Sequence, residues 1–239
     1  MRPLRLGSVV IPPITAATLV VLVVAFILSG IAMRFPAMAM AFDYLPVTTQ
    51  DVLSGQVWRV VTYALLHDLR DPFHLIMNGL VIFWFGRQLE ERWATGRYLL
   101  FMFLTVLFGG LFVVVAGVLG LGAGAAQGAS AFAYGLMVAW GLTYRERELR
   151  FMFAIPMKGI HMVWVAMFFW VLDAVSASPH SAAAHLGGMV TAAALVLGVW
   201  NTNKVKLVWA SFLEKIGAKK ATKLYVVPAS KGPDKKWVN

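Results

Sequence analysis

Six long apolar runs constrain this chain more than any other feature of its sequence. An α-helix needs about 20 apolar residues to cross a bilayer, and charged residues are kept out of the middles of these runs. The sequence therefore predicts an all-α membrane protein with six transmembrane helices. The predicted spans cover residues 10–33, 73–89, 98–120, 128–143, 159–177 and 182–200. The second and fourth are short, which favours helices that begin below the membrane surface.

The composition supports one compact helical bundle. Of 239 residues, 60% are hydrophobic and 13% are charged, whereas soluble domains carry about 25% charged residues. We expect a short cytoplasmic segment at 1–9, the membrane domain at 10–200 and a basic, partly disordered cytoplasmic tail at 201–239. The chain has no cysteine, which excludes disulfides and zinc sites built on thiolates.

The positions of Lys and Arg predict the orientation of the bundle, because cytoplasmic loops are enriched in these residues. If the N-terminus is inside, 18 of the 21 Lys and Arg residues fall in inner loops or the tail. The outer side then receives only Arg34, Arg59 and Arg70. We therefore predict an N-in, C-in bundle whose tail contacts anionic lipid heads rather than nucleic acid. The long first outer loop, 34–72, is amphipathic and is expected to lie in the membrane interface.

The N-terminal region also resembles a signal peptide. Its apolar run, residues 9–33, is longer than the roughly 7 to 15 residues of a cleaved signal, so we interpret it as a retained first span. The lack of a transit-peptide pattern favours a bacterial cytoplasmic membrane.

Polar residues at membrane depth are costly and so indicate functional positions. They are His74, Asn78, Ser130, Tyr134, Asp173 and His185. Three of them, His74, Ser130 and His185, each open a helix that runs inward from the outer surface. These three residues are therefore expected to lie in one layer.

Helix periodicity predicts which of these side chains meet. His74 shares a helix face with Asn78, four residues on, as Ser130 does with Tyr134. His185 lies on a stripe with Gly188 and Ala192, and small residues let two membrane helices approach closely. The stretch GASA at 128–131 supplies a matching smooth face. We expect the fourth and sixth helices to bring Ser130 Oγ to His185.

This arrangement fits a serine nucleophile and a histidine base, without a third carboxylate. Tyr134 is placed to stack on the imidazole. Free backbone N–H groups at the start of the fourth helix, together with His74 and Asn78, could stabilise an oxyanion.

A simpler interpretation applies to each residue taken singly. Serine among Gly and Ala usually packs helices, and a membrane histidine is often a structural hydrogen-bonding group; only the conjunction favours catalysis. The zinc motif H-E-x-x-H is missing, and Asp173 has no second Asp within a span to form an aspartate pair. We interpret His67, His161 and His180 as bystanders, with His180 a weak rival base.

Together these residues resemble the rhomboid intramembrane serine proteases, from the first span to the sixth. The family motifs are W-R in the first loop, H-x-x-x-N and then Gly and Glu on the second helix, G-x-S-G on the fourth, and A-H-x-x-G-x-x-x-G on the sixth. The matching residues are Trp58, Arg59, His74, Asn78, Gly86, Glu90, Gly128, Ala129, Ser130, Ala184, His185 and Gly188. Two positions depart from the motifs, since Ala131 and Ala192 stand where the family usually has glycine.

The resemblance implies roles for these residues. Ser130 would be the nucleophile and His185 the base, with His74, Asn78 and the Ser130 amide forming the oxyanion hole. Tyr134 would pack against the imidazole. Arg59 and Glu90 would be structural polar residues.

The resemblance also implies a function, namely an endopeptidase that cuts other membrane proteins in or near their transmembrane segments. It implies transmembrane substrates and lipids as partners, with no cofactor, metal or nucleic acid. Substrates would reach the site laterally near the second and fifth helices, where Trp164, Phe168, Phe169 and Trp170 supply bulky groups. The alternative, motivated by Ala131, is a catalytically inactive rhomboid-like protein that binds membrane-protein clients. A small transporter is disfavoured because no inverted repeat is visible.

Overall fold

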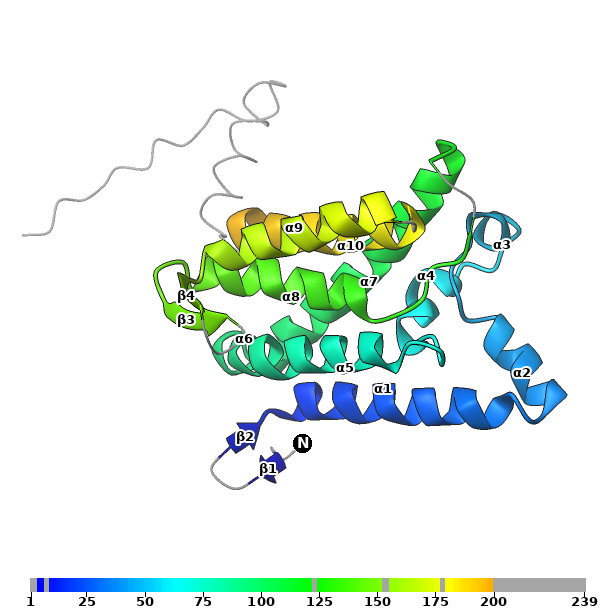
Figure 1. The fold of residues 1–239 in the computed structure, drawn as a ribbon, viewed down its shortest axis with the longest axis horizontal. Helices are drawn as coiled ribbons and strands as arrows, with labels where there is room; N and C mark the ends of the chain where they lie inside the picture. The colour runs from blue at the N-terminus through cyan, green and yellow to red at the C-terminus, as the bar shows by residue number, and fades with distance from the viewer. Residues whose placement is uncertain (1–3, 7–8, 122–123, 152–154, 177–178, 200–239) are drawn as a thin grey trace, which may run out of the picture. The chain divides into compact units, whose positions relative to one another are not determined.

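The computed structural model describes residues 4–6, 9–121, 124–151, 155–176 and 179–199. These residues are mostly helical, and the long helices pack side by side (Figure 1). The principal helices are α1 (Pro13–Ala32), α5 (Pro72–Val81), α7 (Thr95–Val118), α8 (Ser130–Thr143), α9 (His161–Ser176) and α10 (Pro179–Ala194). Within the described ranges, three helical stretches are long and apolar enough to cross a membrane: Pro13–Ala32, Thr95–Val118 and Pro179–Gly198. The predicted tail at 201–239 lies outside the described residues.

Each predicted span contains a helix, but the second span is longer than predicted. α5 continues through a π-helical turn, η2 (Ile82–Gly86), into α6 (Arg87–Trp93). The apolar run ends at Arg87, whereas the helix goes on because Glu90 on α6 is buried against α1. α10 is extended in the same way by a π-helical turn, η3 (Leu195–Val199).

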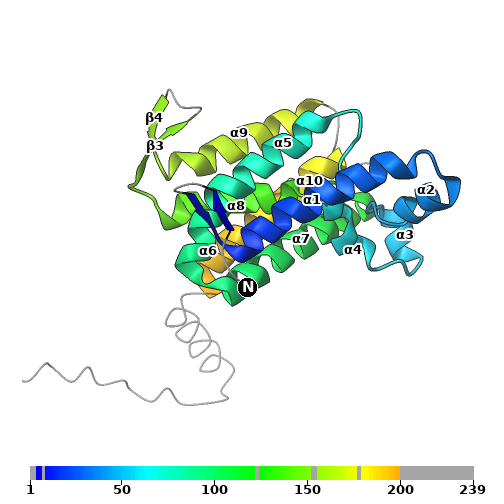
Figure 2. The ribbon, with the colours of Figure 1, turned by 90° about the horizontal axis from the view of Figure 1, so that it is seen from below.

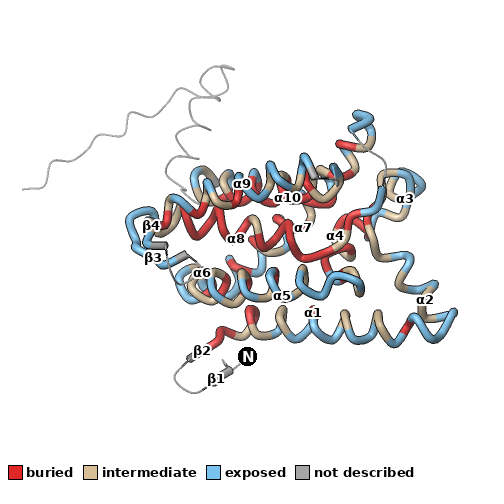
Figure 3. Tube along the Cα trace, viewed as in Figure 1, coloured by how far each residue is buried: buried red, intermediate tan, exposed pale blue. Residues whose placement is uncertain are grey.

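α8 is the central helix, and it is as short as its sequence predicts. It packs against α5, α7, α9 and α10, and nearly all of its residues are buried (Figure 3). A helix surrounded by protein does not have to span the full hydrocarbon thickness, since its ends meet other protein groups rather than lipid. The first residue of α8 is Ser130.

The outer helices expose apolar side chains. α1 lies at the edge of the bundle beside α5 and η2 (Figures 1 and 2). Its outward face carries Val20, Val24 and Ile27, all largely exposed. An exposed apolar stripe on a helix of this length is what a lipid-facing helix requires.

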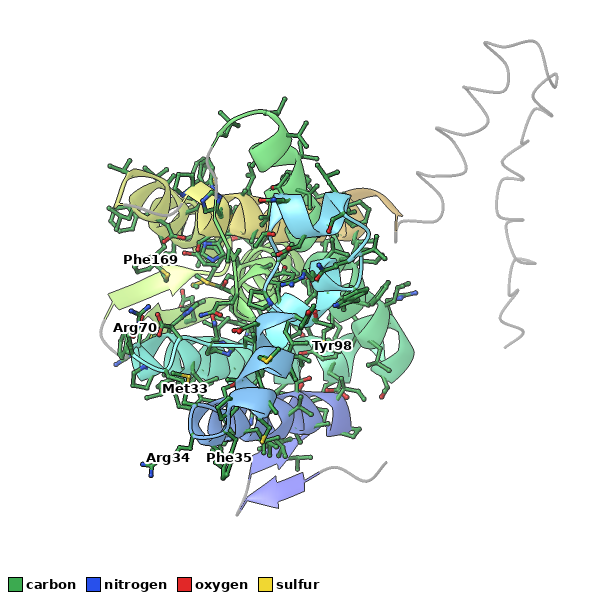
Figure 4. All side chains as sticks on the ribbon, turned by 90° about the vertical axis from the view of Figure 1, so that its right-hand side faces the viewer. Met33, Arg34, Phe35, Arg70, Tyr98 and Phe169 are labelled. Atoms are coloured by element: carbon green, nitrogen blue, oxygen red, sulfur yellow. The ribbon has the colours of Figure 1, made fainter. Side chains whose placement is uncertain are left out.

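The long loop between α1 and α5 is folded. It contains α2 (Pro36–Asp43), α3 (Thr49–Leu53), α4 (Arg59–Thr62) and the 3-10 turn η1 (Tyr63–Leu65), which gather at the end of the bundle where α8 begins (Figure 1). The Tyr63 hydroxyl donates to Val106 O on α7 at 2.9 Å. Where the loop leaves α1, Arg34 and Phe35 project away from the fold (Figure 4).

Two antiparallel hairpins depart from the all-α prediction. They pair β1 (Leu4–Leu6) with β2 (Val9–Ile11) and β3 (Glu148–Phe151) with β4 (Ile155–Lys158). Both lie at the end of the bundle opposite the folded loop (Figure 1). Strands of three or four residues are too short to show a period of two in the sequence.

Glycines on α10 let it approach both α7 and α8. A Cβ built on Gly187 would lie 2.6 Å from Phe108 O of α7, and one built on Gly188 would lie 2.7 Å from the carbonyl carbon of Ala131 on α8. Both distances are shorter than side chains tolerate. The predicted small-residue stripe therefore forms, and it sets the spacing of α8 and α10.

Candidate active site

Ser130 lies at the N-terminal end of α8, after a tight turn. Gly128 has φ of 118°, a left-handed conformation that only glycine adopts without strain. Its N–H donates to Tyr63 O at 3.0 Å, which ties the turn to the folded loop. The turn leaves the serine side chain buried at the start of the helix, where backbone N–H groups have no partner within the helix.

Ser130 and His185 contact each other directly. Ser130 Oγ lies 2.7 Å from His185 Nε2. Both residues are buried, at 4% and 5% exposure. The sequence predicted this contact from close packing of the fourth and sixth helices. Gly188 lies one turn beyond His185 and contacts Ala131, the neighbour of Ser130.

The imidazole of His185 is also held on its face. The ring of Tyr134 stacks on it with centroids 4.2 Å apart and an interplanar angle of 12°. Tyr134 is one turn after Ser130 on α8, so one helix provides both the hydroxyl and the stacking ring. The Ser130 hydroxyl and the Tyr134 ring together limit the rotation of the His185 imidazole about its side-chain bonds.

Asp173 of α9 approaches the other imidazole nitrogen. Its Oδ2 lies 2.7 Å from His185 Nδ1, although the two atoms do not meet at hydrogen-bonding angles. Asp173 and His185 therefore form a close electrostatic contact. From the sequence we expected no carboxylate beside the imidazole, because the sequence showed the depth of Asp173 but not the rotation of α9.

His74 and Asn78 lie on the α5 face beside the serine. α5 begins at Pro72, and Asp71 caps it by accepting from the His74 N–H at 3.3 Å. A Cβ built on Gly128 would lie 2.9 Å from His74 Cε1 and 3.7 Å from Ser130 Oγ. The His74 ring is thus adjacent to the turn that carries the serine.

His67, interpreted from the sequence as a bystander, contacts residues next to Ser130. It is 3% exposed, and its Nε2 accepts from Asn78 Nδ2 at 3.2 Å and from the Ala129 N–H at 3.4 Å. Burial, and to a lesser degree the charge of His74, lowers the pKa of His67 to about 4. A neutral His67 therefore orients Asn78 and the backbone next to Ser130. No motif spacing in the sequence signalled this role.

The W-R pair stabilises the folded loop. Arg59 is buried and donates to Asp43 O at 2.9 Å, to Pro46 O at 2.7 Å and to Gln56 Oε1 at 2.8 Å. The Trp58 indole donates to Tyr44 O at 3.1 Å. These contacts hold the loop at the end of the bundle where the serine lies.

Glu90 anchors α6 to the start of α1. Its two carboxylate oxygens accept from the N–H groups of Ile14 at 3.0 Å and Thr15 at 2.8 Å. A carboxylate at a helix N-terminus satisfies free donors and interacts favourably with the helix dipole. Gly86, one turn earlier, contacts the Tyr98 hydroxyl, where a side chain would not fit.

Ala131 packs between helices. It is fully buried, and a Cβ built on Gly109 of α7 would lie 2.6 Å from its methyl carbon. The methyl group therefore lies in the seam between α7 and α8. Ala192, the other departure from the family motif, is also fully buried.

The remaining histidines do not meet Ser130. His161 lies at the start of α9, and its Nδ1 accepts from the Lys158 N–H at 3.3 Å. His180 contacts the Gly124 backbone. Across the described part of the chain, no cluster of three or more His, Asp or Glu side chains could hold a metal ion.

A family model described as "Rhomboid domain" matches residues 54–202, more than half of the chain. A search of curated proteins found no match. The matched range contains the W-R pair, both oxyanion-hole candidates, Ser130 and His185.

Proposed function

The chain belongs to the rhomboid family, and on that premise we propose that it is a serine endopeptidase of other membrane proteins. It hydrolyses peptide bonds in or near their transmembrane segments. The observation that carries the proposal is the 2.7 Å contact between Ser130 Oγ and His185 Nε2. A serine hydroxyl is a weak nucleophile unless an adjacent base takes its proton, and this geometry supplies the base.

The reaction proceeds in two halves. Ser130 Oγ attacks the scissile carbonyl carbon while its proton passes to His185 Nε2. The carbon–nitrogen bond then breaks as His185 returns that proton to the leaving amine, which leaves an ester on Ser130. Water attacks the ester with the same assistance from His185, releasing the new carboxylate and the free serine.

The oxyanion of each tetrahedral intermediate needs hydrogen-bond donors. The Ser130 N–H lies at the free N-terminal end of α8. Asn78 donates one amide hydrogen to His67, which orients its second hydrogen, and His74 lies beside the same turn. Loss of one such donor lowers kcat by about 10²- to 10³-fold in a well-studied serine protease.

The membrane topology that we propose has six spans with both termini inside. α1, α7 and Pro179–Gly198 meet the length and hydropathy of spanning helices. α8 and α9 are shorter apolar helices, and the α5–η2–α6 stretch runs alongside them (Figure 1). The distribution of Lys and Arg supports this orientation, and a bacterial cytoplasmic membrane remains our proposal for its location.

Substrates are proposed to arrive laterally near α5 and α9. Trp164, Phe168 and Phe169 of α9 are exposed apolar side chains, as the sequence predicts. Trp170 differs, because it is only partly exposed and its indole donates to Ala182 O at 2.8 Å. Trp170 therefore attaches α9 to α10 rather than facing lipid.

An inactive client-binding protein is the second candidate function, and Ala131 is the observation that favours it. The methyl group lies in the seam with Gly109, where it fills space between helices. Cleavage by the wild-type protein distinguishes the two functions, because an inactive client-binding protein would not cut.

The test uses purified wild-type protein beside Ser130→Ala and His185→Ala. Each protein is incubated in detergent with a generic transmembrane substrate, and products are followed by gel and mass spectrometry. We expect wild type to cut and both variants to lose activity. Cleavage at equal rates by all three proteins would overturn the proposal.

A further inference from the structure

Asp173 is an intramembrane carboxylate that the two-residue mechanism does not use. It lies near the C-terminal end of α9, and its Oδ2 lies 2.7 Å from Nδ1 of His185. The Asp173 side chain is 30% exposed, whereas Oδ2 itself is buried. His185 is the ion-pair partner found for Asp173 in the described part of the chain. The imidazole is thus flanked by a hydroxyl at Nε2 and a carboxylate at Nδ1.

This placement bears on which imidazole nitrogen carries the proton. His185 can act as a base toward Ser130 only when Nε2 is unprotonated, so the ring proton must be on Nδ1. A carboxylate next to Nδ1 favours that tautomer. It also stabilises the imidazolium that forms when Nε2 takes the serine proton.

The other groups around the imidazole do not provide this function. Tyr134 covers the ring face, and Ser130 contacts Nε2. His74 of α5 lies beside the serine turn and carries no negative charge. Asp173 is therefore the acidic group in contact with the base.

We propose that Asp173 is a positioning residue that holds the proton of His185 on Nδ1, so that α9 supplies the third member of a Ser130–His185–Asp173 triad. The inference rests on the proposed function, because Asp173 would orient the base, His185, that the proposed reaction uses. The triad joins three helices, since Ser130 is on α8, Asp173 on α9 and His185 on α10.

The contact depends on how α9 is attached to α10. Trp170 lies three residues before Asp173 and so on the same face of α9. Its indole Nε1 donates to Ala182 O, three residues before His185, at 2.8 Å. The α9 face that presents the carboxylate is therefore held on α10 by a second polar contact.

The first experiment measures kcat and KM separately for Asp173→Asn, Asp173→Ala and Asp173→Glu. In a serine protease whose acid hydrogen-bonds to the imidazole, replacing that Asp by Asn lowers kcat by about 10⁴-fold. The Asp173 contact does not have hydrogen-bonding angles, so we expect kcat to fall by about 10- to 100-fold in the Asn and Ala variants. KM stays within about twofold of wild type, because the ground-state complex does not use this contact. The Glu variant recovers part of the loss because it keeps the charge.

Leu172→Ala is the matched control, because Leu172 is the exposed neighbour of Asp173 on α9. It should cut like wild type. An Asp173→Asn variant that melts at the wild-type temperature and keeps wild-type kcat would overturn the inference.

A second measurement does not require activity. In the Ser130→Ala background, ¹⁵N NMR of labelled histidine reports which nitrogen of His185 is protonated. We expect the Nδ1–H tautomer with Asp173 present and a shift toward Nε2–H with Asp173→Asn. Identical spectra would refute the positioning role, whereas failure of wild type to cut would refute only the proposed function.

A double-mutant cycle tests the attachment of α9. Trp170→Phe keeps the ring but removes the indole donor to Ala182 O. Since both residues act through the position of the carboxylate, we expect Trp170→Phe to add little to the loss caused by Asp173→Asn. Fully additive losses would show that Trp170 acts independently of the triad.

Discussion

Replacing Gly188 by alanine tests whether the spacing of α8 and α10 sets the catalytic contact. Gly188 lies one turn beyond His185 and faces Ala131, the residue next to Ser130. A Cβ at this position would collide with the Ala131 carbonyl oxygen and lie 2.7 Å from the carbonyl carbon, whereas ordinary contacts begin at 3.4 Å, so the carbon distance gives a lower bound on the shift. The two backbones must therefore separate by about 0.7 Å or more at this level.

The same separation stretches the Ser130–His185 contact. It starts at 2.7 Å, so a shift of at least that size takes it to about 3.4 Å or beyond, at or past the limit of a hydrogen bond. A misplacement of about 1 Å in a catalytic group lowers activity by about 10²-fold. We expect Gly188→Ala to lose about that factor in kcat/KM and about 1–3 kcal/mol of stability.

The assay is cleavage of a fluorescent transmembrane substrate, with thermal melting of each variant. Gly198→Ala is the matched control, because a Cβ built on Gly198 has no heavy atom within 4 Å. It should keep wild-type activity and melting temperature. If Gly188→Ala cuts at the wild-type rate, the spacing of α8 and α10 does not control the contact between Ser130 and His185.

Glu90→Gln should lower the free energy of unfolding by about 1–3 kcal/mol, because one carboxylate oxygen that accepts from the start of α1 is lost; an unchanged melting temperature would contradict this. Gly128→Ala should reduce kcat by about tenfold or more while the fold is retained, since a side chain at φ of 118° is strained and lies 2.9 Å from His74; circular dichroism checks the fold. Folding lowers the pKa of His67 from 6.5 to about 4, so the unfolded chain binds more protons than the folded chain between these pH values. The free energy of unfolding should therefore drop as pH falls through that window. In melting curves recorded across this pH range, His67→Gln should show a smaller drop.

The contact between Ser130 and His185 could be predicted from the sequence because membrane depth and helix periodicity are local properties. The depth of His74, Ser130 and His185 follows from where each apolar run begins. The small residues around Ser130 and after His185 predicted the close approach that produces the 2.7 Å contact. The stacking of Tyr134 follows from its four-residue spacing from Ser130.

The contacts that were missed depend on helix rotation and on loop folding, which residue spacing does not encode. Asp173 meets His185 because of how α9 is turned about its axis. His67 reaches Asn78 because the loop before α5 folds back into the bundle. Trp170 points toward α10, although its apolar neighbours gave it the signature of a lipid-facing residue.

The fold departs from the sequence prediction mainly at helix ends. Charged residues after Gly86 end the apolar run, but Glu90 is buried by pairing with backbone donors of α1, so the helix continues. The β3–β4 hairpin forms in the connection between α8 and α9, where hydropathy predicts only a loop. These differences leave the positions of the site residues on their helices unchanged.

Covalent labelling can identify the nucleophilic residue of this chain. Wild-type protein is treated with a serine-directed fluorophosphonate, and the modified residue is identified by peptide mapping with mass spectrometry. We expect one adduct on Ser130, which is lost in Ser130→Ala and strongly reduced in His185→Ala. No adduct on Ser130 in wild-type protein that is folded by its melting curve would contradict the claim that this serine is the nucleophile.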